Sequence, residues 1–214
     1  MTAPPQFQSS NAPAGATSAP GLVTRVTNIL TKPKQEWGVI AGESTSTAAL
    51  YSGYIMILAA IPAVAAFIQM SLIGIGIFRV GIATALVAMI VSYALGLVGV
   101  YLAAFVIDKL APSFQSQSNL LQALKLVAYA YTAAWVAGVF NILPYIGILG
   151  VLAGGIYSIY LFYLGLPVMM KTPRDKVIVY MIVSAVVIFV IYLVIGLVVS
   201  SITAAAFLGS RVIG

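Results

Sequence analysis

The sequence predicts an all-α protein, a polytopic transmembrane helical bundle with five spans. Of its 214 residues, 62% are hydrophobic and only 7% are charged, whereas about a quarter of the residues in a soluble domain are charged. The hydrophobic residues form five separate runs, and about 20 apolar residues are enough for one helix to cross a bilayer. This composition excludes a soluble enzyme, a soluble binding module and a disordered protein.

The five spans are expected within a membrane domain that covers residues 46–208. Their approximate positions are 48–70, 80–107, 126–143, 146–170 and 177–200. No charge separates the third span from the fourth, but one helix over both would be about 67 Å long, twice the thickness of the hydrocarbon core. Asn141, Pro144 and Gly147 fall within seven residues there, and these residue types are typical of a turn. The sequence therefore predicts a tight helical hairpin.

The segment before the spans divides into two parts. Residues 1–21 are uncharged and rich in Pro, Ala, Ser and Gln, which predicts a disordered tail, and they lack the basic start and apolar stretch of a signal peptide. Residues 22–41 are expected to form an interfacial amphipathic segment, since apolar residues from Leu22 to Leu30 fall on one helix face. This segment could lie on the membrane or dock against the bundle. Its candidate lipid contacts are Arg25, Lys32, Lys34 and Trp37.

The distribution of Lys and Arg predicts the orientation of the spans. With five spans and a cytoplasmic N-terminus, eight of the ten cations lie inside, and only Arg79 and Arg211 lie outside. Basic loops are retained in the cytoplasm. We therefore expect an integral protein of the bacterial cytoplasmic membrane, with its C-terminus on the far side.

Reactive side chains are scarce. The chain has no His, no Cys and four carboxylates, and no Asp, Glu or Lys lies deep in a predicted span. Enzyme activity is therefore not expected, and no cofactor or metal ligand set is indicated. The cations are spread singly, without the dense basic patch of a nucleic-acid-binding protein. Anionic lipid headgroups on the cytoplasmic side are the expected counter-charge.

Small residues recur at intervals of four in two predicted spans. They are Ala130, Ala134 and Gly138 in the third, and Gly150, Gly154 and Ser158 in the fourth. Such stripes allow helices to approach closely in lipid. They could form an oligomer contact or, as we favour, internal packing of the bundle.

Twelve tyrosines are also present, several of them within spans. A buried Tyr hydroxyl needs a hydrogen-bond partner. One interpretation is a cavity with a partly polar lining, to which Tyr131, Trp135, Asn141 and Tyr157 would contribute. The preferred interpretation is hydrogen bonding between helices.

Four strings resemble bacterial members of the Yip (Ypt-interacting protein) domain family. They are KPKQEW at 32–37, VIAGE at 39–43, ALKLVAYAYTAAWVAG at 123–138 and NILPYIGILGVLAGGIYSIYLFYLGLPVMMKTP at 141–173. The resemblance runs from about Leu22 to Leu208. It implies five spans, a cytoplasmic N-terminus and a short C-terminus on the far side, and it supplies no catalytic residues that could be mapped onto this chain. Eukaryotic relatives act in vesicle traffic and bind prenylated small GTPases, but the N-terminal region here is small, so that role is not transferred.

These observations predict a non-enzymatic membrane organiser or adaptor that acts through protein–protein and lipid contacts. Its expected partners are membrane lipids, further copies of itself or other membrane proteins. The alternative is a passage or transporter for lipids or small amphiphilic solutes. A continuous polar cavity or a lateral groove would favour passage, whereas a tightly packed bundle would favour an adaptor.

Overall fold

The computed structural model describes residues 20–74 and 79–212, with side chains described up to residue 205. The described chain contains five helical segments that are long and apolar enough to span a membrane. They are Thr47–Ile73, Ile82–Phe114, Leu120–Ile142, Gly147–Met169 and Val177–Ala205. The predicted all-α fold with five spans is confirmed. The predicted disordered tail falls almost wholly on residues 1–19, outside the described residues.

Most spans contain more than one helical element. The first comprises α3 (Thr47–Leu50), the π-helical η1 (Tyr51–Ile55), α4 (Met56–Ile68) and the π-helical η2 (Gln69–Ile73). The second comprises α5 (Ile82–Leu110) and the 3₁₀ turn η3 (Ala111–Phe114). The third comprises α6 (Leu120–Ala130), α7 (Thr132–Ala137) and the 3₁₀ turn η4 (Gly138–Ile142). The fourth is α8 (Gly147–Met169), and the fifth lies in α9 (Val177–Val212).

Three spans extend further than the hydropathy pattern indicates. The second continues past Asp108 to Phe114, because a helix does not have to end where the hydrocarbon ends. The third begins at Leu120, where the Asn119 side chain accepts a hydrogen bond of 3.0 Å from the Gln122 N–H and so caps the helix. The predicted span began only after Lys125, the cation in the second turn of this helix. In the fifth span, α9 continues to Val212.

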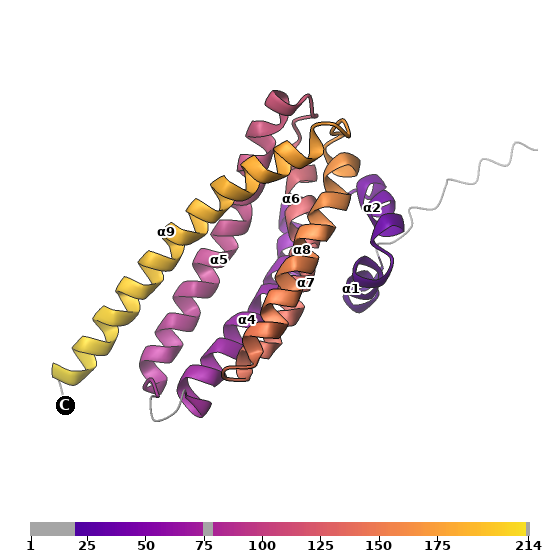
Figure 1. Cartoon of the computed structure of the whole chain (residues 1–214). Helices are drawn as coiled ribbons and strands as arrows, with labels where there is room; N and C mark the ends of the chain where they lie inside the picture. The colour runs from indigo at the N-terminus through magenta and orange to yellow at the C-terminus, as the bar shows by residue number, and fades with distance from the viewer. Residues whose placement is uncertain (1–19, 75–78, 213–214) are drawn as a thin grey trace, which may run out of the picture.

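The third span lies at the centre of the bundle and is the most buried of the five. It packs against α4, α5 and α8, while α9 lies along α5 and diverges from α4 and α8 (Figure 1). The fifth span is accordingly the least buried. The apolar core is tightest around α6, where Leu124, Leu126 and Ala128 have no exposed surface.

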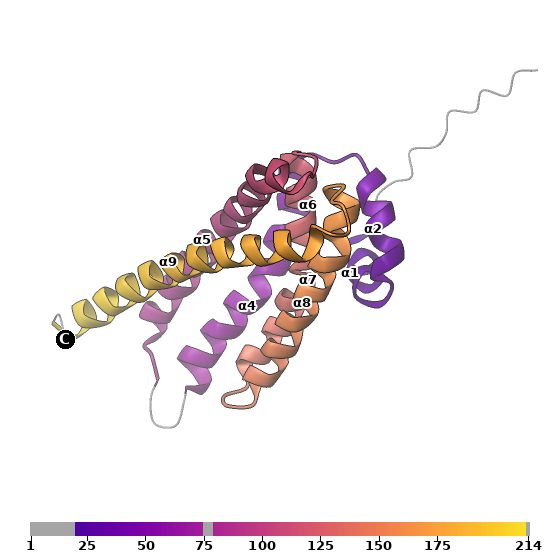
Figure 2. The same ribbon diagram turned by 45° about the horizontal axis from the view of Figure 1, so that its top comes forward.

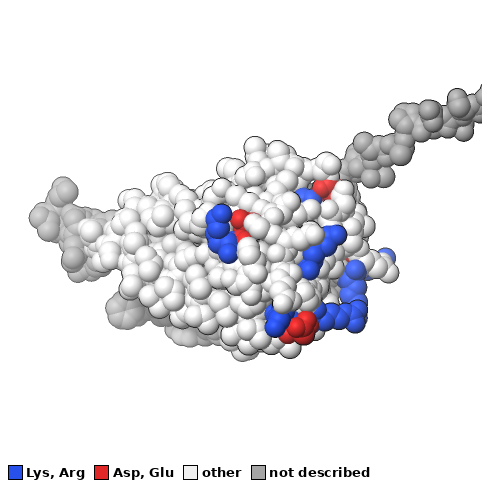
Figure 3. Space-filling model, turned by 90° about the horizontal axis from the view of Figure 1, so that it is seen from above, with Lys and Arg blue, Asp and Glu red and all other residues white. Residues whose placement is uncertain are grey.

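The two ends of the bundle differ in charge. One end, here called the charged end, contains the segments 43–46, 115–119 and 170–176, and Lys, Arg, Asp and Glu side chains are visible across it in Figure 3. Two of these loops are tied together, because the Gln117 N–H donates to the Met170 carbonyl at 2.8 Å and Ser116 bonds to Thr172 at 2.9 Å. The opposite end contains the short turn 143–146 between the third and fourth spans.

That turn has the tight geometry expected from Asn141, Pro144 and Gly147. Tyr145 adopts a left-handed conformation with φ of 67°. A Cβ atom at Gly147 would lie 2.1 Å from the Phe140 carbonyl oxygen, so only glycine fits where α8 begins.

The segment before the first span forms two helices, α1 (Leu22–Thr31) and α2 (Pro33–Gly42), here called the N-terminal hairpin. Both lie beside α7 and α8, on the side of the bundle away from α5 and α9 (Figures 1 and 2). Ile29, Trp37 and Ile40 have no exposed surface. Of the two arrangements considered for this segment, the structure has the one docked against the bundle.

Candidate functional site

A buried charge cluster joins the two helices of the N-terminal hairpin and connects the hairpin to the bundle through Lys125. It consists of Arg25, Glu36, Glu43 and Lys125. The Arg25 guanidinium donates through one nitrogen to the Glu36 carboxylate and through the other to the Glu43 carboxylate. Arg25 is 3% exposed and Glu36 is 6% exposed, so these charges are withdrawn from solvent. A buried ion pair persists only where its partners are close and well bonded.

Lys125 fixes the end of the same hairpin from the third span. Its Nζ donates to the Ile40 carbonyl at 3.0 Å and to the Glu43 carbonyl. These carbonyls lie where α2 ends, so the cation both satisfies free backbone acceptors and opposes the negative end of the helix dipole. Gln122, one turn earlier on α6, adds a bond of 3.3 Å to the Ala41 carbonyl.

Aromatic side chains surround the charge cluster. The Arg25 guanidinium carbon lies 5.6 Å from the centroid of the Tyr129 ring, within the range of a cation–π contact. Tyr54 and Trp37 pack on that ring, with centroids 4.6 Å and 6.4 Å away. The Tyr54 hydroxyl is bonded to the Thr132 hydroxyl at 2.6 Å. Aromatic rings therefore cover the side of the cluster that faces the bundle.

The bonding of the charge cluster indicates a structural role. Two cations face two carboxylates, so the cluster is neutral as a unit. Lys125 makes two hydrogen bonds to carbonyls, and Arg25 makes one to each of the two carboxylates. Three grooves elsewhere in the described chain are lined by other residues. The arrangement can hold two helices together and against a bundle. The hydrogen bonds of Arg25 and Lys125 are made to groups of the chain itself.

The placement of the predicted lipid contacts differs from the expectation at two of four positions. Arg25 and Trp37 are buried, whereas Lys32 and Lys34 are exposed. Arg25 turns inward because two carboxylates are available to it in a segment that the bundle covers. The signal was present in the sequence, since half of the four carboxylates in the chain lie within eighteen residues after Arg25. Lys125 was missed because it stood at the predicted boundary of a span.

The small residues of the third and fourth spans lie inside the molecule. A Cβ atom at Gly154 would lie 2.2 Å from the Cβ of Ala137, and one at Gly150 would lie 2.4 Å from the Phe140 ring. Ser158 accepts a hydrogen bond of 3.0 Å from the Ala134 N–H. Ala130 is fully buried, and a Cβ at Gly138 would meet Pro62 of the first span at 2.6 Å. The structure places both stripes in contacts within one chain.

The four residues predicted to line one cavity are not brought together. Trp135 lines a groove of about 240 Å³ with Ser92, Tyr93 and Tyr192, and Tyr131 packs against Trp135 with ring centroids 5.9 Å apart. Tyr157 instead donates to the Leu30 carbonyl at 2.6 Å, which joins α8 to the hairpin. Asn141 is half-buried in η4.

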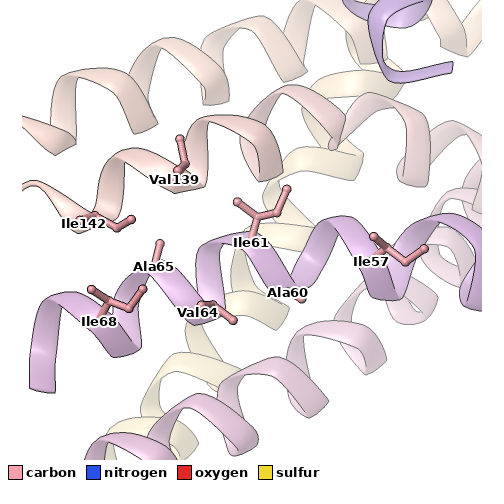
Figure 4. Close-up of a pocket in the computed structure, with 8 residues that line it drawn as sticks. All are labelled: Ile57, Ala60, Ile61, Val64, Ala65, Ile68, Val139 and Ile142. Atoms are coloured by element: carbon pink, nitrogen blue, oxygen red, sulfur yellow. The ribbon is translucent and has the colours of Figure 1, made fainter. Parts of the chain in front are cut away.

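Two further grooves open at the side of the bundle. One, of about 610 Å³, lies among α4, α5 and α9, and it includes the hydroxyl groups of Thr84, Ser92, Ser200 and Thr203. It shares Ser92 with the groove beside Trp135. The other, of about 320 Å³, lies between α4 and η4 and has only apolar lining residues (Figure 4).

The fold and this site define a polytopic membrane protein with a docked N-terminal hairpin. The chain belongs to the Yip1 domain family, whose model matches residues 27–197, well over half of the chain. The match contains α2, Glu36, Glu43 and Lys125, and it confirms the resemblance found in the sequence.

Two curated relatives are similar over most of their length. The chain is 25% identical over 162 residues to the inner membrane protein YohC of Escherichia coli strain K12, covering 72% of this chain and 83% of the relative. The same values hold for YohC of E. coli O6:H1 strain CFT073. No solved structure matches the chain.

Proposed function

We propose that the protein is a non-enzymatic organiser or adaptor that acts through protein–protein and lipid contacts. The observation that carries this proposal is the charge cluster. Arg25, Glu36 and Glu43 tie α1 to the two ends of α2, and Lys125 ties the last residues of α2 to α6. A rigidly docked hairpin provides a fixed surface to partners, whereas a flexible one would pay an ordering cost on binding.

The charged end and the hairpin are proposed to face the cytoplasm. Lys171 and Arg174 belong to this end and Lys109 lies beside it in the last turn of α5, while Arg79 lies at the opposite end. This asymmetry agrees with the retention of basic loops in the cytoplasm. The relative YohC is named an inner membrane protein, which supports placement in the bacterial cytoplasmic membrane.

The spans themselves supply contact surface for lipids, for a second copy or for another membrane protein. The fifth span contacts mainly α5 and is nearly free elsewhere. Its outward side chains include Ile182, Phe189 and Val190, which are 54%, 66% and 53% exposed. Association of helices in lipid depends on close packing and not on hydrophobicity alone, so this face accepts either lipid or a complementary helix.

A lipid or amphiphile passage is the second candidate, and the two grooves that share Ser92 favour it. They open sideways among α4, α5 and α9 and combine an apolar lining with several hydroxyls. Toward the charged end, however, α6 is tightly enclosed by the core. The grooves therefore suit an acyl chain held at the side of the bundle better than a solute that crosses it.

Gentle extraction of the tagged protein from native membranes, followed by mass spectrometry, tests the proposed function. We expect a membrane protein partner close to one-to-one stoichiometry, absent from a mock purification. Recovery of a defined lipid or metabolite without any protein, together with flux of that compound into reconstituted vesicles, would replace the adaptor with the passage.

A further inference from the structure

The depth of the N-terminal hairpin follows from its contacts with α8. This helix has 23 residues, about 34 Å at 1.5 Å per residue, close to the roughly 30 Å of a hydrocarbon core. Tyr157 lies ten residues after Gly147 and twelve before Met169, near the middle of the span. Its hydroxyl donates to the Leu30 carbonyl at 2.6 Å. The end of α1 therefore lies beside the middle of α8.

Two other sets of contacts show how the hairpin is oriented along α8. The Trp37 ring packs against Gly165, so closely that a Cβ atom there would lie 2.6 Å from the ring. Gly165 is four residues from the charged end of α8. Lys125 and Gln122, in the first turns of α6, bond to the last residues of α2. The hairpin thus runs from the charged end, where α2 ends, toward the middle of α8, where α1 ends.

The exposed edge of the hairpin near this turn is polar and basic. Thr27, Thr31, Lys32, Lys34 and Gln35 are all exposed. Glu36, the carboxylate of the hairpin itself, is buried and bonded to Arg25. Lys32 and Lys34 therefore face outward without an exposed carboxylate on the hairpin, at a depth where an unpartnered ammonium is costly.

We propose that Lys32 and Lys34 bind the phosphate of an anionic phospholipid that is drawn below the level of the surrounding headgroups. Charge complementarity selects this occupant, since two cations require an anion and the equivalent edge of a second copy would be equally basic. The polar hydroxyls beside the lysines suit a hydrated headgroup. This inference rests on the cytoplasmic placement proposed above and adds a defined lipid site to it.

Lipid retention tests the site. The protein is reconstituted in vesicles of phosphatidylglycerol and phosphatidylcholine, extracted into mild detergent and examined by native mass spectrometry. We expect retained phosphatidylglycerol to bind about 25-fold more weakly in the K32Q/K34Q variant, because each lysine contributes about fivefold. The matched variant K171Q/R174Q removes the same charge from exposed loop positions, and we expect it to change retention less than twofold. Equal losses in the two variants, or none in K32Q/K34Q, would overturn the site.

The depth is measured separately with a nitroxide on T31C or I156C, since the natural chain has no Cys. Ile156 is 68% exposed on α8, next to Tyr157. A label at position 31 should be reached by a water-soluble nickel reagent severalfold better than one at position 156. Equal, low accessibility at both positions would show plain hydrocarbon at the edge, and a dimer lost in K32Q/K34Q would assign the edge to a second copy. Both results contradict the inference. If extraction recovers a protein partner but the lysine variants retain phosphatidylglycerol normally, the lipid site is refuted and the proposed function stands. If the lysine variants lose the lipid but no protein partner is recovered, the proposed function is refuted and the lipid site stands.

Discussion

Replacing Arg25 with methionine is expected to lower the free energy of unfolding by about 3–5 kcal/mol. The substitution leaves the Glu36 and Glu43 carboxylates near each other without their shared cation. Methionine also loses the cation–π contact with Tyr129. Thermal unfolding in detergent, followed by the near-ultraviolet circular dichroism of Trp37 and its neighbours, measures the change.

Three further variants make this result interpretable. R25K keeps the charge but cannot bridge two carboxylates with a planar fork, so an intermediate loss is expected. R25M/E36Q/E43Q removes the charges of Arg25 and of both its carboxylate partners, leaves that of Lys125, and should regain part of the stability. R79M removes an exposed cation from the opposite end and should have little effect. If R25M were as stable as R79M, the charge cluster would not hold the hairpin.

Two adjacent glycines of α8 are expected to respond to alanine in opposite directions. At Gly154 the new methyl group would lie 2.2 Å from the Ala137 Cβ and 2.8 Å from the Ala133 carbonyl oxygen. Neither neighbour is a flexible side chain, so overpacking should cost about 1–3 kcal/mol. At Gly155 nothing lies within 4 Å, and alanine should gain up to about 1 kcal/mol through its higher helix propensity.

Unfolding of G154A and G155A under the same detergent conditions gives the two signs. The comparison also separates the two interpretations of the small-residue stripe. A stripe used only between copies of the protein would leave monomer stability unchanged in G154A and reduce crosslinked oligomers instead. That outcome would contradict the internal seam between α7 and α8.

The sequence predicts the five spans because each depends on a local property, the length of an apolar run. The turn between the third and fourth spans was equally predictable, since Asn141, Pro144 and Gly147 break a helix wherever they occur together. The family was likewise recognisable from short strings such as KPKQEW. All of these features are encoded in contiguous residues.

The charge cluster was not predicted because it is not local. Arg25 and Lys125 are a hundred residues apart, and they share a neighbourhood only after α2 has packed on α8 and its end has been bonded by Lys125 of α6. Each cation was therefore assigned to the membrane surface, which is the usual place for a cation beside a span. The tyrosines illustrate the same limit. Tyr157 reaches Leu30 across 127 residues of sequence, so its partner could not be found from spacing along a helix.

Cysteine accessibility in oriented membranes tests the central claim, a hairpin docked at the cytoplasmic end. The natural chain has no Cys, so K171C, R79C and I40C each provide one defined thiol. An impermeant maleimide should label K171C only in inside-out vesicles and R79C only in right-side-out vesicles. It should leave I40C unlabelled until denaturant is added, because Ile40 is a residue of α2 that is fully buried where the hairpin docks on the bundle. Rapid labelling of I40C in intact vesicles, or reversed sidedness of the two exposed positions, would contradict the account.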